Sequence, residues 1–171
     1  MTVRTILIAA MTAACALGVP MVAAAETPPA AASAERASDA ANMAVLDRFY
    51  LAFAMNDEAT IAGLLAGAMI WKEGKGARFA GHNSDDVPGA VFEGVFGHAV
   101  AQFESFGASA SLYLPSGSHV VALGHYAGYK RSTDELLNTG FAHVFTFSDG
   151  RIVHFQQFTE TAPWIEDATP D

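Results

Sequence analysis

The chain has 171 residues, of which 51% are hydrophobic and 16% are charged, and its formal net charge is −9 at pH 7. This length and composition fit one globular domain of modest size and exclude a disordered chain, a collagen and a coiled coil. The excess of carboxylates repels phosphate backbones and anionic lipid surfaces, so the sequence disfavours nucleic-acid binding.

The N-terminus has the layout of a secretory signal peptide. The positive charge of Arg4 precedes an apolar run from Thr5 to Val19, and three alanines occupy positions 23–25. This run is short for a membrane span and well placed for cleavage before Glu26. We therefore predict a signal peptide at residues 1–25, no membrane span, and a mature protein in the periplasm or outside the cell.

The only cysteine, Cys15, lies inside this apolar run, so no disulfide is expected in the mature domain. A second interpretation makes Cys15 a lipid-anchored N-terminus. The segment Thr12-Ala13-Ala14-Cys15 resembles a lipoprotein processing site, but it lacks the usual leucine three residues before the cysteine. Both interpretations export the chain.

Three segments are expected after the signal peptide. Residues 26–37 are rich in Pro, Ala and Ser and contain no aromatic residue, which predicts a flexible tether. A single domain is expected over residues 38–165, followed by a tail over residues 166–171. Without disulfides, the stability of this domain must come from its core.

Helices are expected in the first half of the domain. Apolar residues recur about every four positions over Ser38–Asn56, which predicts an amphipathic helix. Asn56 and Asp57 can cap a second, short helix that runs to about Leu65. A third helix is expected to begin within Ser84–Pro88 and to continue to about Phe103.

Strands dominate the second half. Short strands are expected over Ala68–Glu73 and Arg78–Ala80, and after Phe106 the apolar period changes to two. Turn residues then separate four longer predicted strands: Ala108–Leu114, His119–Lys130, Thr139–Phe147 and Arg151–Thr161. Helices followed by a strand meander predict an α+β fold with the helices on one face of an antiparallel sheet.

His143 is the clearest candidate functional residue, because it interrupts an apolar run in what is predicted to be a central strand. A buried polar group costs free energy unless it is hydrogen-bonded. One interpretation is therefore a core histidine bonded to a neighbour. The other is a general acid or base that lines a cavity, since imidazole titrates near neutral pH.

The partners of His143 on the last strand depend on the turn that joins the two strands. If Asp149-Gly150 form a two-residue type I′ turn, His143 lies opposite Gln156, and Glu160 shares that face by its even spacing. The acid–base pair would then be His143 and Glu160.

A three-residue loop over Ser148–Gly150 gives a different pairing. His143 would then lie opposite Phe155, and Gln157 would join the face of His143. The sequence leaves the choice between the two turns open.

Trp71 and Tyr126 are candidates for core packing or for the walls of a pocket. Gly124 and Gly128 flank Tyr126 on one strand face, and glycines inside a strand often mark a bend or a close approach by another group. The sequence therefore predicts a curved sheet.

Cofactor and metal motifs are missing from the sequence. The six histidines form no HExxH or HxH pattern, so no metal site is predicted. The chain also contains no Gly-rich phosphate loop, no GxSxG elbow and no cysteine nucleophile. We expect no cofactor and neither nucleotide nor acyl-enzyme chemistry.

Over about Ala44 to Trp164 the chain resembles the SnoaL-like, ketosteroid-isomerase-related group of the NTF2-like superfamily. The resemblance is carried by four segments: FYLAFAMNDEATIAGLLAGAMIWKEG, FEGVFGH, LGHYAG and FAHVFTFSDGRIVHFQQFTETA. It implies an NTF2-like cone, in which three N-terminal helices pack on a curved antiparallel β-sheet around an apolar cavity. It also implies a homodimer formed through the outer face of the sheet.

The resemblance places three catalytic positions of the ketosteroid isomerases on this chain. The tyrosine position falls on Phe49, the base on Lys72 or Glu73, and the protonated aspartate on His143. Because Phe49 has no hydroxyl group and His143 stands in place of the aspartate, steroid isomerisation of that type is not expected.

Other pocket positions are retained. Glu160 stands near the end of the last strand, where SnoaL-like proteins have an aspartate, so it is the preferred candidate base together with His143. Trp71 matches a pocket tryptophan, and Tyr126 and Gln157 are candidate ligand-binding residues. We expect a small, largely apolar, carbonyl-bearing ligand and isomerase, cyclase or lyase chemistry.

Two non-catalytic alternatives stay open at this stage. The domain can be a carrier or sensor that uses the same polar groups only to orient a small ligand. It can also be a protein-interaction module that uses the outer sheet face near Val121 and Leu123, and this alternative predicts no usable cavity.

Overall fold

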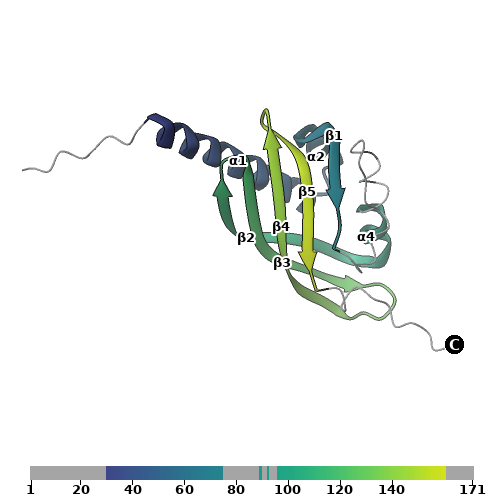
Figure 1. The fold of residues 1–171 in the computed structure, drawn as a ribbon. Coiled ribbons are helices and arrows are strands. Elements are labelled where there is room, and N and C mark those ends of the chain that lie inside the picture. The colour runs from purple at the N-terminus through teal and green to yellow at the C-terminus, as the bar shows by residue number, and fades with distance from the viewer. Residues whose placement is uncertain (1–29, 75–88, 90–91, 93–95, 161–171) are drawn as a thin grey trace, which may run out of the picture.

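The structure is a computed structural model that describes residues 30–74, 89, 92 and 96–160 (Figure 1). The predicted signal peptide, the strand over Arg78–Ala80, the start of the third helix and the tail over residues 166–171 lie outside these residues. No helix in the described part is long and apolar enough to cross a membrane.

The first helix, α1 (Ala30–Ala54), begins eight residues before the predicted start at Ser38. The prediction of a flexible tether is therefore wrong for residues 30–37, which are helical and largely exposed. Alanine is the strongest helix former, so this Ala-rich segment extends the amphipathic helix without any packing of its own. These first turns project beyond the sheet (Figure 1).

The second helix, α2 (Glu58–Leu64), confirms the predicted cap. The Asp57 side chain accepts a hydrogen bond from the Thr60 backbone N–H at 3.0 Å. Strand β1 (Leu65–Lys72) follows at once, because the chain is already extended at Leu65. The predicted start of this strand at Ala68 was thus too late.

Helix α4 (Gly97–Gln102) leads into a five-stranded sheet of order β1-β5-β4-β3-β2. The four strands after it are β2 (Phe103–Ser116), β3 (His119–Lys130), β4 (Leu136–Ser148) and β5 (Arg151–Thr159). These four pair antiparallel as predicted, but β1 pairs parallel with β5, so the sheet is mixed. Because β1 is separated from β5 in sequence by three other strands, no hairpin imposes an antiparallel pairing on it.

Two glycines of β3 allow the sheet to bend. A Cβ atom at Gly124 would lie 2.1 Å from the Ser109 carbonyl oxygen, and one at Gly128 would lie 2.4 Å from that of Ser105. Only glycine permits this close approach of β2, which confirms the interpretation made from the sequence. Tyr126 lies between the two glycines on the same face.

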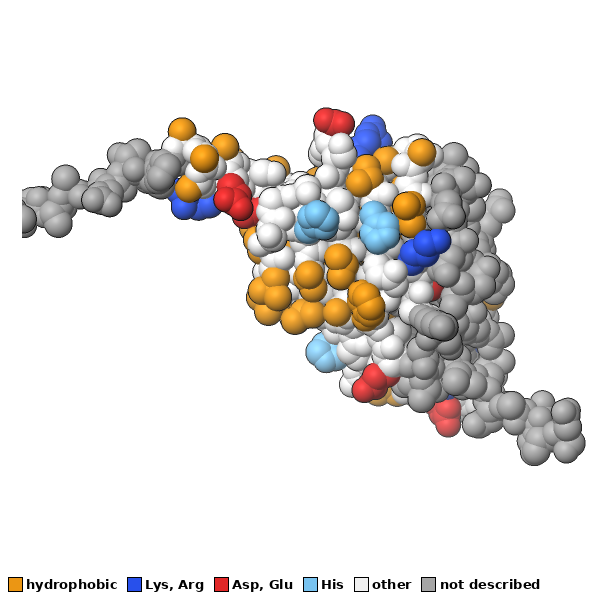
Figure 2. Space-filling view, viewed as in Figure 1, with side chains coloured by type: hydrophobic (Ala, Val, Ile, Leu, Met, Phe, Trp, Pro, Cys, Tyr) orange, Lys and Arg blue, Asp and Glu red, His pale blue; other side chains and the backbone are white. Residues whose placement is uncertain are grey.

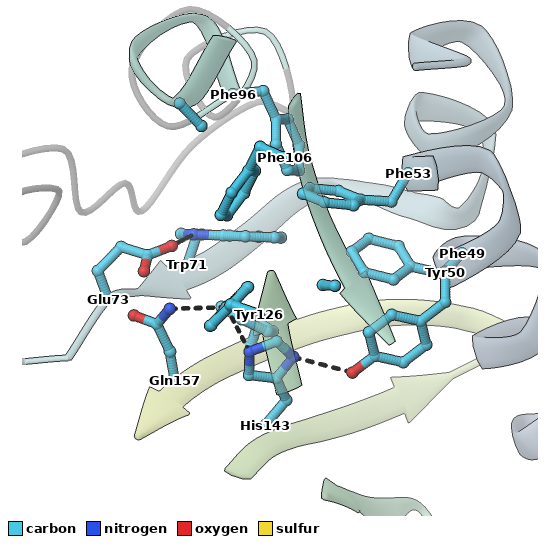
Figure 3. A pocket seen from close by; sticks show the side chains of 13 residues that line it. Phe49, Tyr50, Phe53, Trp71, Glu73, Phe96, Phe106, Tyr126, His143 and Gln157 are labelled. Carbon is cyan, nitrogen blue, oxygen red and sulfur yellow. Dashed lines mark hydrogen bonds between the residues drawn. The ribbon is translucent and has the colours of Figure 1, made fainter. Parts of the chain in front are cut away.

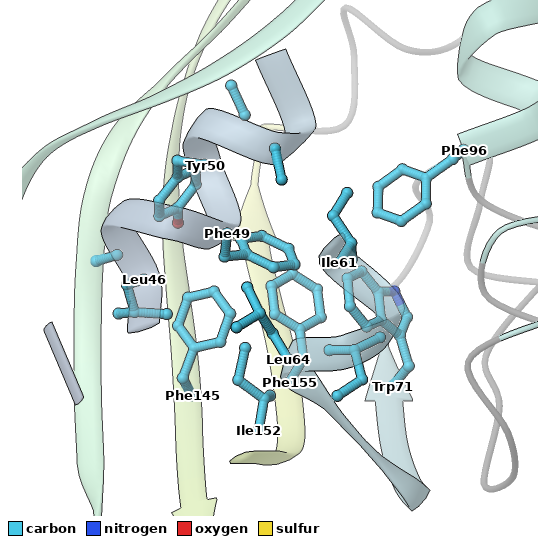
Figure 4. Close-up of a cluster of buried hydrophobic side chains, with 14 of the residues drawn as sticks. Leu46, Phe49, Tyr50, Ile61, Leu64, Trp71, Phe96, Phe145, Ile152 and Phe155 are labelled. Atoms are coloured by element: carbon cyan, nitrogen blue, oxygen red, sulfur yellow. The ribbon is translucent and has the colours of Figure 1, made fainter. Parts of the chain in front are cut away.

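The helices cover one face of the curved sheet, which we call the inner face; the opposite face is the outer face. Helix α1 contacts β2 and β3, α2 contacts β1, and α4 contacts β2. The core between the layers contains a cluster of aromatic rings, in which Phe145 lies 5.7 Å from Phe49 and 5.2 Å from Phe155 between ring centroids (Figure 4). This packing holds α1 and the last two strands in fixed relation around the site.

Candidate functional site

A cavity lies between the helices and the inner face of the sheet (Figure 3). Its wall consists of eight aromatic side chains, two alanines and three polar side chains: Phe49, Tyr50, Phe53, Trp71, Phe96, Phe106, Tyr126, Phe155, Ala99, Ala108, Glu73, His143 and Gln157. The cavity is small, with a volume of about 30 Å³. The cavity is therefore narrow and mostly apolar, with polar groups at only a few points of its wall.

The polar groups are joined by a chain of hydrogen bonds. Tyr50 Oη lies 2.8 Å from His143 Nδ1, and Tyr126 Oη lies 2.6 Å from His143 Nε2. Gln157 Nε2 donates to Tyr126 Oη at 2.7 Å, and the Gly74 backbone N–H donates to Gln157 Oε1 at 3.1 Å. The chain thus connects α1, three strands and the segment that follows β1.

His143 is the centre of this chain of hydrogen bonds. Burial lowers the pKa of its imidazole from 6.5 to about 3, so the ring is neutral at physiological pH. Both ring nitrogens are occupied by tyrosine hydroxyls, and a neutral imidazole donates at one nitrogen and accepts at the other. The neutral ring thus bridges the hydroxyl groups of Tyr50 and Tyr126.

Glu73 is the carboxylate that lines the cavity. It follows the end of β1, it is only 5% exposed, and its Oε1 accepts a hydrogen bond of 2.6 Å from Trp71 Nε1. Burial raises the pKa of Glu73 to about 7, even though the bond from Trp71 acts in the opposite direction. A carboxyl group that titrates near pH 7 is suited to both accepting and returning a proton.

Tyr126 lies close enough to Glu73 for the two groups to influence each other. Burial raises the pKa of the Tyr126 hydroxyl well above 10, and the negative charge of Glu73 raises it further. The hydroxyl therefore stays protonated and is a hydrogen-bond donor over the whole physiological pH range.

The turn between β4 and β5 is the two-residue form, but the pairing matches neither prediction. Asp149 and Gly150 both have positive φ, and Ser148 pairs with Arg151. A β-bulge then inserts Val153 and shifts the register by one residue. As a result His143 pairs with Gln157, which brings Gln157 onto the inner face.

The same shift removes Glu160 from the site, which corrects the prediction that it is the base. Glu160 lies beyond the end of β5 and is exposed, and its Oε2 accepts a hydrogen bond of 3.4 Å from Thr139 Oγ1. It is not part of the cavity wall described above. The carboxylate at the cavity is Glu73, one of the two positions that the family resemblance assigned to the base.

The remaining predicted residues lie where a pocket requires them. Trp71 and Tyr126 line the cavity, and Trp71 stacks on Phe155 at 3.9 Å between centroids. The hydroxyl at the helix position belongs to Tyr50, one residue after the position that the resemblance gave. The wide apolar stripe of α1 places both Phe49 and Tyr50 inside, so periodicity alone does not separate them.

Within the part of the chain that the structure describes, no group of three or more His, Cys, Asp or Glu side chains is arranged to hold a metal ion. The chemistry available in the cavity is that of one carboxyl group, two phenols, an imidazole and an amide.

No protein-family model matches the sequence, and no curated protein matches it. Solved structures do resemble the fold. An NTF2-like protein from Burkholderia thailandensis E264 is 26% identical with a TM-score of 0.66, over 71% of this chain and 92% of that one. TerC, co-crystallised with polyporic acid, is 16% identical with a TM-score of 0.64, over 71% and 93% of the two chains.

A putative SnoaL-like polyketide cyclase from Jannaschia sp. CCS1 is 10% identical with a TM-score of 0.61, over 72% of this chain and 88% of that one. Helices folded over one face of a curved sheet, with an aromatic cavity between them, define a cone-shaped α+β domain. The chain belongs to the NTF2-like superfamily, as the sequence resemblance implied.

Proposed function

We propose that this domain binds a small, largely apolar molecule with a carbonyl group and moves a proton on the carbon beside that carbonyl. The observation that carries this proposal is the pair of Glu73 and Tyr126 in one aromatic cavity. Glu73 titrates near pH 7, and Tyr126 keeps its proton. A base and a hydrogen-bond donor facing one space are what enolisation requires.

In this reaction Glu73 takes the proton from the carbon, the electron pair of the broken C–H bond forms the C=C bond of an enolate, and the π pair of the carbonyl moves onto its oxygen. Tyr126 donates a hydrogen bond to that oxygen. Glu73 then returns the proton to another carbon in an isomerase. In a cyclase the enolate carbon attacks a second carbonyl, whose oxygen takes the proton from Glu73. In a lyase the enolate expels a group from the next carbon, and that group leaves with the electron pair of its bond and the proton from Glu73. The aromatic walls exclude water and strengthen these polar contacts.

The hydrogen-bond chain supports the role of Tyr126. When His143 accepts from Tyr50 at Nδ1, its Nε2–H donates to Tyr126, whose oxygen also accepts from Gln157. In this tautomer the Tyr126 hydroxyl keeps its own hydrogen, which it can donate to a ligand oxygen. His143 and Gln157 are positioning residues in this scheme, because they act through Tyr126.

Binding without catalysis is the second candidate function, and the small room inside the cavity favours it. Among the similar structures, TerC was co-crystallised with polyporic acid and a ketosteroid isomerase-like protein from Catenulispora acidiphila was solved with trimethylamine. A carrier or sensor would use Glu73 and Tyr126 only to orient its ligand.

Two further features belong to the proposal. Residues 1–25 direct export to the periplasm or the exterior, which N-terminal sequencing of the secreted protein tests by finding Glu26 first. The domain also forms a homodimer through the outer sheet face, where exposed apolar side chains gather (Figure 2).

The experiment is deuterium exchange of the hydrogens beside the carbonyl of 2-butanone in D₂O, followed by NMR. The wild-type protein is expected to accelerate exchange, Glu73→Gln to lower the rate by about 10²- to 10⁴-fold, and Tyr126→Phe by about 10²- to 10³-fold. Glu35→Gln, an exposed position on α1, is the matched control and keeps the wild-type rate. Binding of 2-butanone with no acceleration of exchange would leave the carrier or sensor as the function.

A further inference from the structure

A second cavity adjoins the first. It is larger, with a volume of about 180 Å³. Its interior is apolar and its rim carries four exposed polar side chains, Asn56, Glu58, Glu104 and Arg131. Nothing in the proposed reaction uses this space.

Four residues line both cavities, namely Phe53, Phe96, Ala99 and Phe106. Three of them are phenylalanines from different parts of the chain: Phe53 on α1, Phe96 just before α4, and Phe106 on β2. The Phe53 ring lies 5.1 Å from that of Phe96 and 5.8 Å from that of Phe106 between centroids. Figure 3 shows these rings on the side of the cavity opposite His143 and Gln157.

This arrangement means that ring side chains form much of the boundary between the two spaces. A side chain can change rotamer without any movement of the sheet or the helices, which is far faster and less costly than a backbone rearrangement. The first cavity has a volume of only about 30 Å³, so the tail of a longer ligand must extend beyond it. The phenylalanine boundary leads to the larger space.

We propose that the two cavities form one elongated binding channel for a ligand that carries its carbonyl at one end and an unbranched or flat apolar tail of about five or more carbons. The carbonyl end lies at Glu73 and Tyr126, and the tail crosses between Phe53, Phe96 and Phe106 into the second cavity. This inference rests on the proposed function for the placement of the carbonyl.

The charges at the rim bear on the far end of the ligand. Glu58 and Glu104 carry negative charges, and Arg131 carries a positive one, so the rim does not present a single sign of charge. A carboxylate or ammonium group at the end of the tail would face a like charge as well as an opposite one. The channel therefore fits a tail whose end is uncharged.

The test is a series of methyl ketones, from 2-butanone to 2-nonanone, titrated by calorimetry. Each buried methylene should raise the affinity about fourfold, so 2-nonanone should bind at least about 100-fold more tightly than 2-butanone. The blocking variant is Ala54→Trp, because Ala54 is exposed and lines only the second cavity. The matched control is Ala44→Trp, also exposed on α1 and in the wall of neither cavity.

Ala54→Trp is expected to weaken the binding of 2-nonanone by at least about tenfold and to leave the binding of 2-butanone unchanged. Ala44→Trp is expected to change the affinity for neither ketone. A second readout is the NMR signal of the Ile61 methyl groups, which line only the second cavity and should shift with 2-nonanone but not with 2-butanone. Equal effects of the two tryptophan variants, or an unshifted Ile61, would overturn the channel. If the protein accelerates exchange on 2-butanone, the proposed function stands whether or not the channel exists. If affinity rises with the length of the ketone but exchange is not accelerated, only the catalytic step is removed.

Discussion

Glu73 is the residue at which the requirements of the site conflict with those of stability. Its carboxyl group is buried against Trp71, and its pKa rises from 4.5 in a solvated chain to about 7 in the fold. The folded protein thus holds the proton more tightly than the unfolded chain between these two pH values. The stability that this provides is complete below pH 4.5 and is lost as the pH rises through 7.

We predict that Glu73→Gln stabilises the protein at pH 8 but not at pH 4. The amide still offers an oxygen to Trp71 Nε1 and carries no charge to desolvate, so the free energy of unfolding should rise by about 3 kcal/mol at pH 8 relative to the change at pH 4. Urea denaturation of both proteins at each pH measures this, with Glu35→Gln as the exposed control. A variant that is less stable than the wild type at pH 8 would show that burial of the charged Glu73 carboxylate does not cost stability.

His143 contributes to the pH dependence with the opposite sign. Its pKa is lowered from 6.5 to about 3, so stability is lost as the pH falls from 6.5 toward 3, where the unfolded chain binds the extra proton. Because both proteins in the Glu73 comparison contain His143, its contribution cancels in the difference. The maximum of stability is expected between the two effects, in weakly acidic solution.

The site was partly predictable from single residues. His143, Gln157, Trp71 and Tyr126 stand out because polar or amphipathic side chains interrupt apolar runs, and the structure brings all four to one cavity. Glu73 gives no such signal, since it follows the end of a strand in a Gly-rich segment. Its role depends on burial by elements distant in sequence, which local pattern does not encode.

At the scale of the element, strand β3 decides the shape of the sheet. The positions of Gly124 and Gly128 leave room for the backbone of β2, and the intervening Tyr126 reaches the cavity. A second irregularity in β2 inserts Ser111 opposite β3 and moves Leu112 to the outer face. Bends and bulges of this kind determine which side chains meet in the site.

We predict that Gly124→Ala destabilises the domain by about 2–3 kcal/mol or more, because the added Cβ atom would overlap the Ser109 carbonyl oxygen, a backbone atom that has little freedom to move. The control is Gly107→Ala on β2, where an added Cβ atom has no neighbour within 4 Å. Thermal denaturation of the two variants measures the difference. Similar melting temperatures for both would mean that β2 and β3 are not closely apposed at Gly124.

The elements themselves were well predicted where a single period extends over many residues. β3 has the predicted bounds, and β4 and β5 differ from them by a few residues, because alternation and strong turn residues mark them. The register of the last hairpin was not predictable. The bulge at Val153 leaves the turn unchanged, but it moves the side chains that follow it in β5 to the opposite face of the sheet. The parallel pairing of β1 was also missed, because the first strand has no neighbour in sequence to pair with.

At the scale of the whole molecule, the outer sheet face carries two rows of side chains that cross the strands. Leu112, Leu123, Ala142 and Phe158 are successive partners in one row, and Leu114, Val121 and Val144 in the next. Three of these side chains are strongly exposed, with Leu114 at 50% and Phe158 at 56%. A continuous exposed apolar surface of this kind is typical of a protein–protein interface.

The last prediction concerns the dimer proposed on this surface. Leu114→Lys is expected to shift the protein from dimer to monomer, because an ammonium group placed against the same apolar rows of a second copy loses its hydration without gaining a partner. Leu51→Lys on α1 is the control, since Leu51 is 61% exposed and lies on the opposite side of the sheet from these rows. Sedimentation velocity over a range of protein concentrations measures both variants. A wild-type chain that sediments as a monomer at every concentration, or a dimer that Leu114→Lys leaves intact, would show that these rows serve a different partner or none.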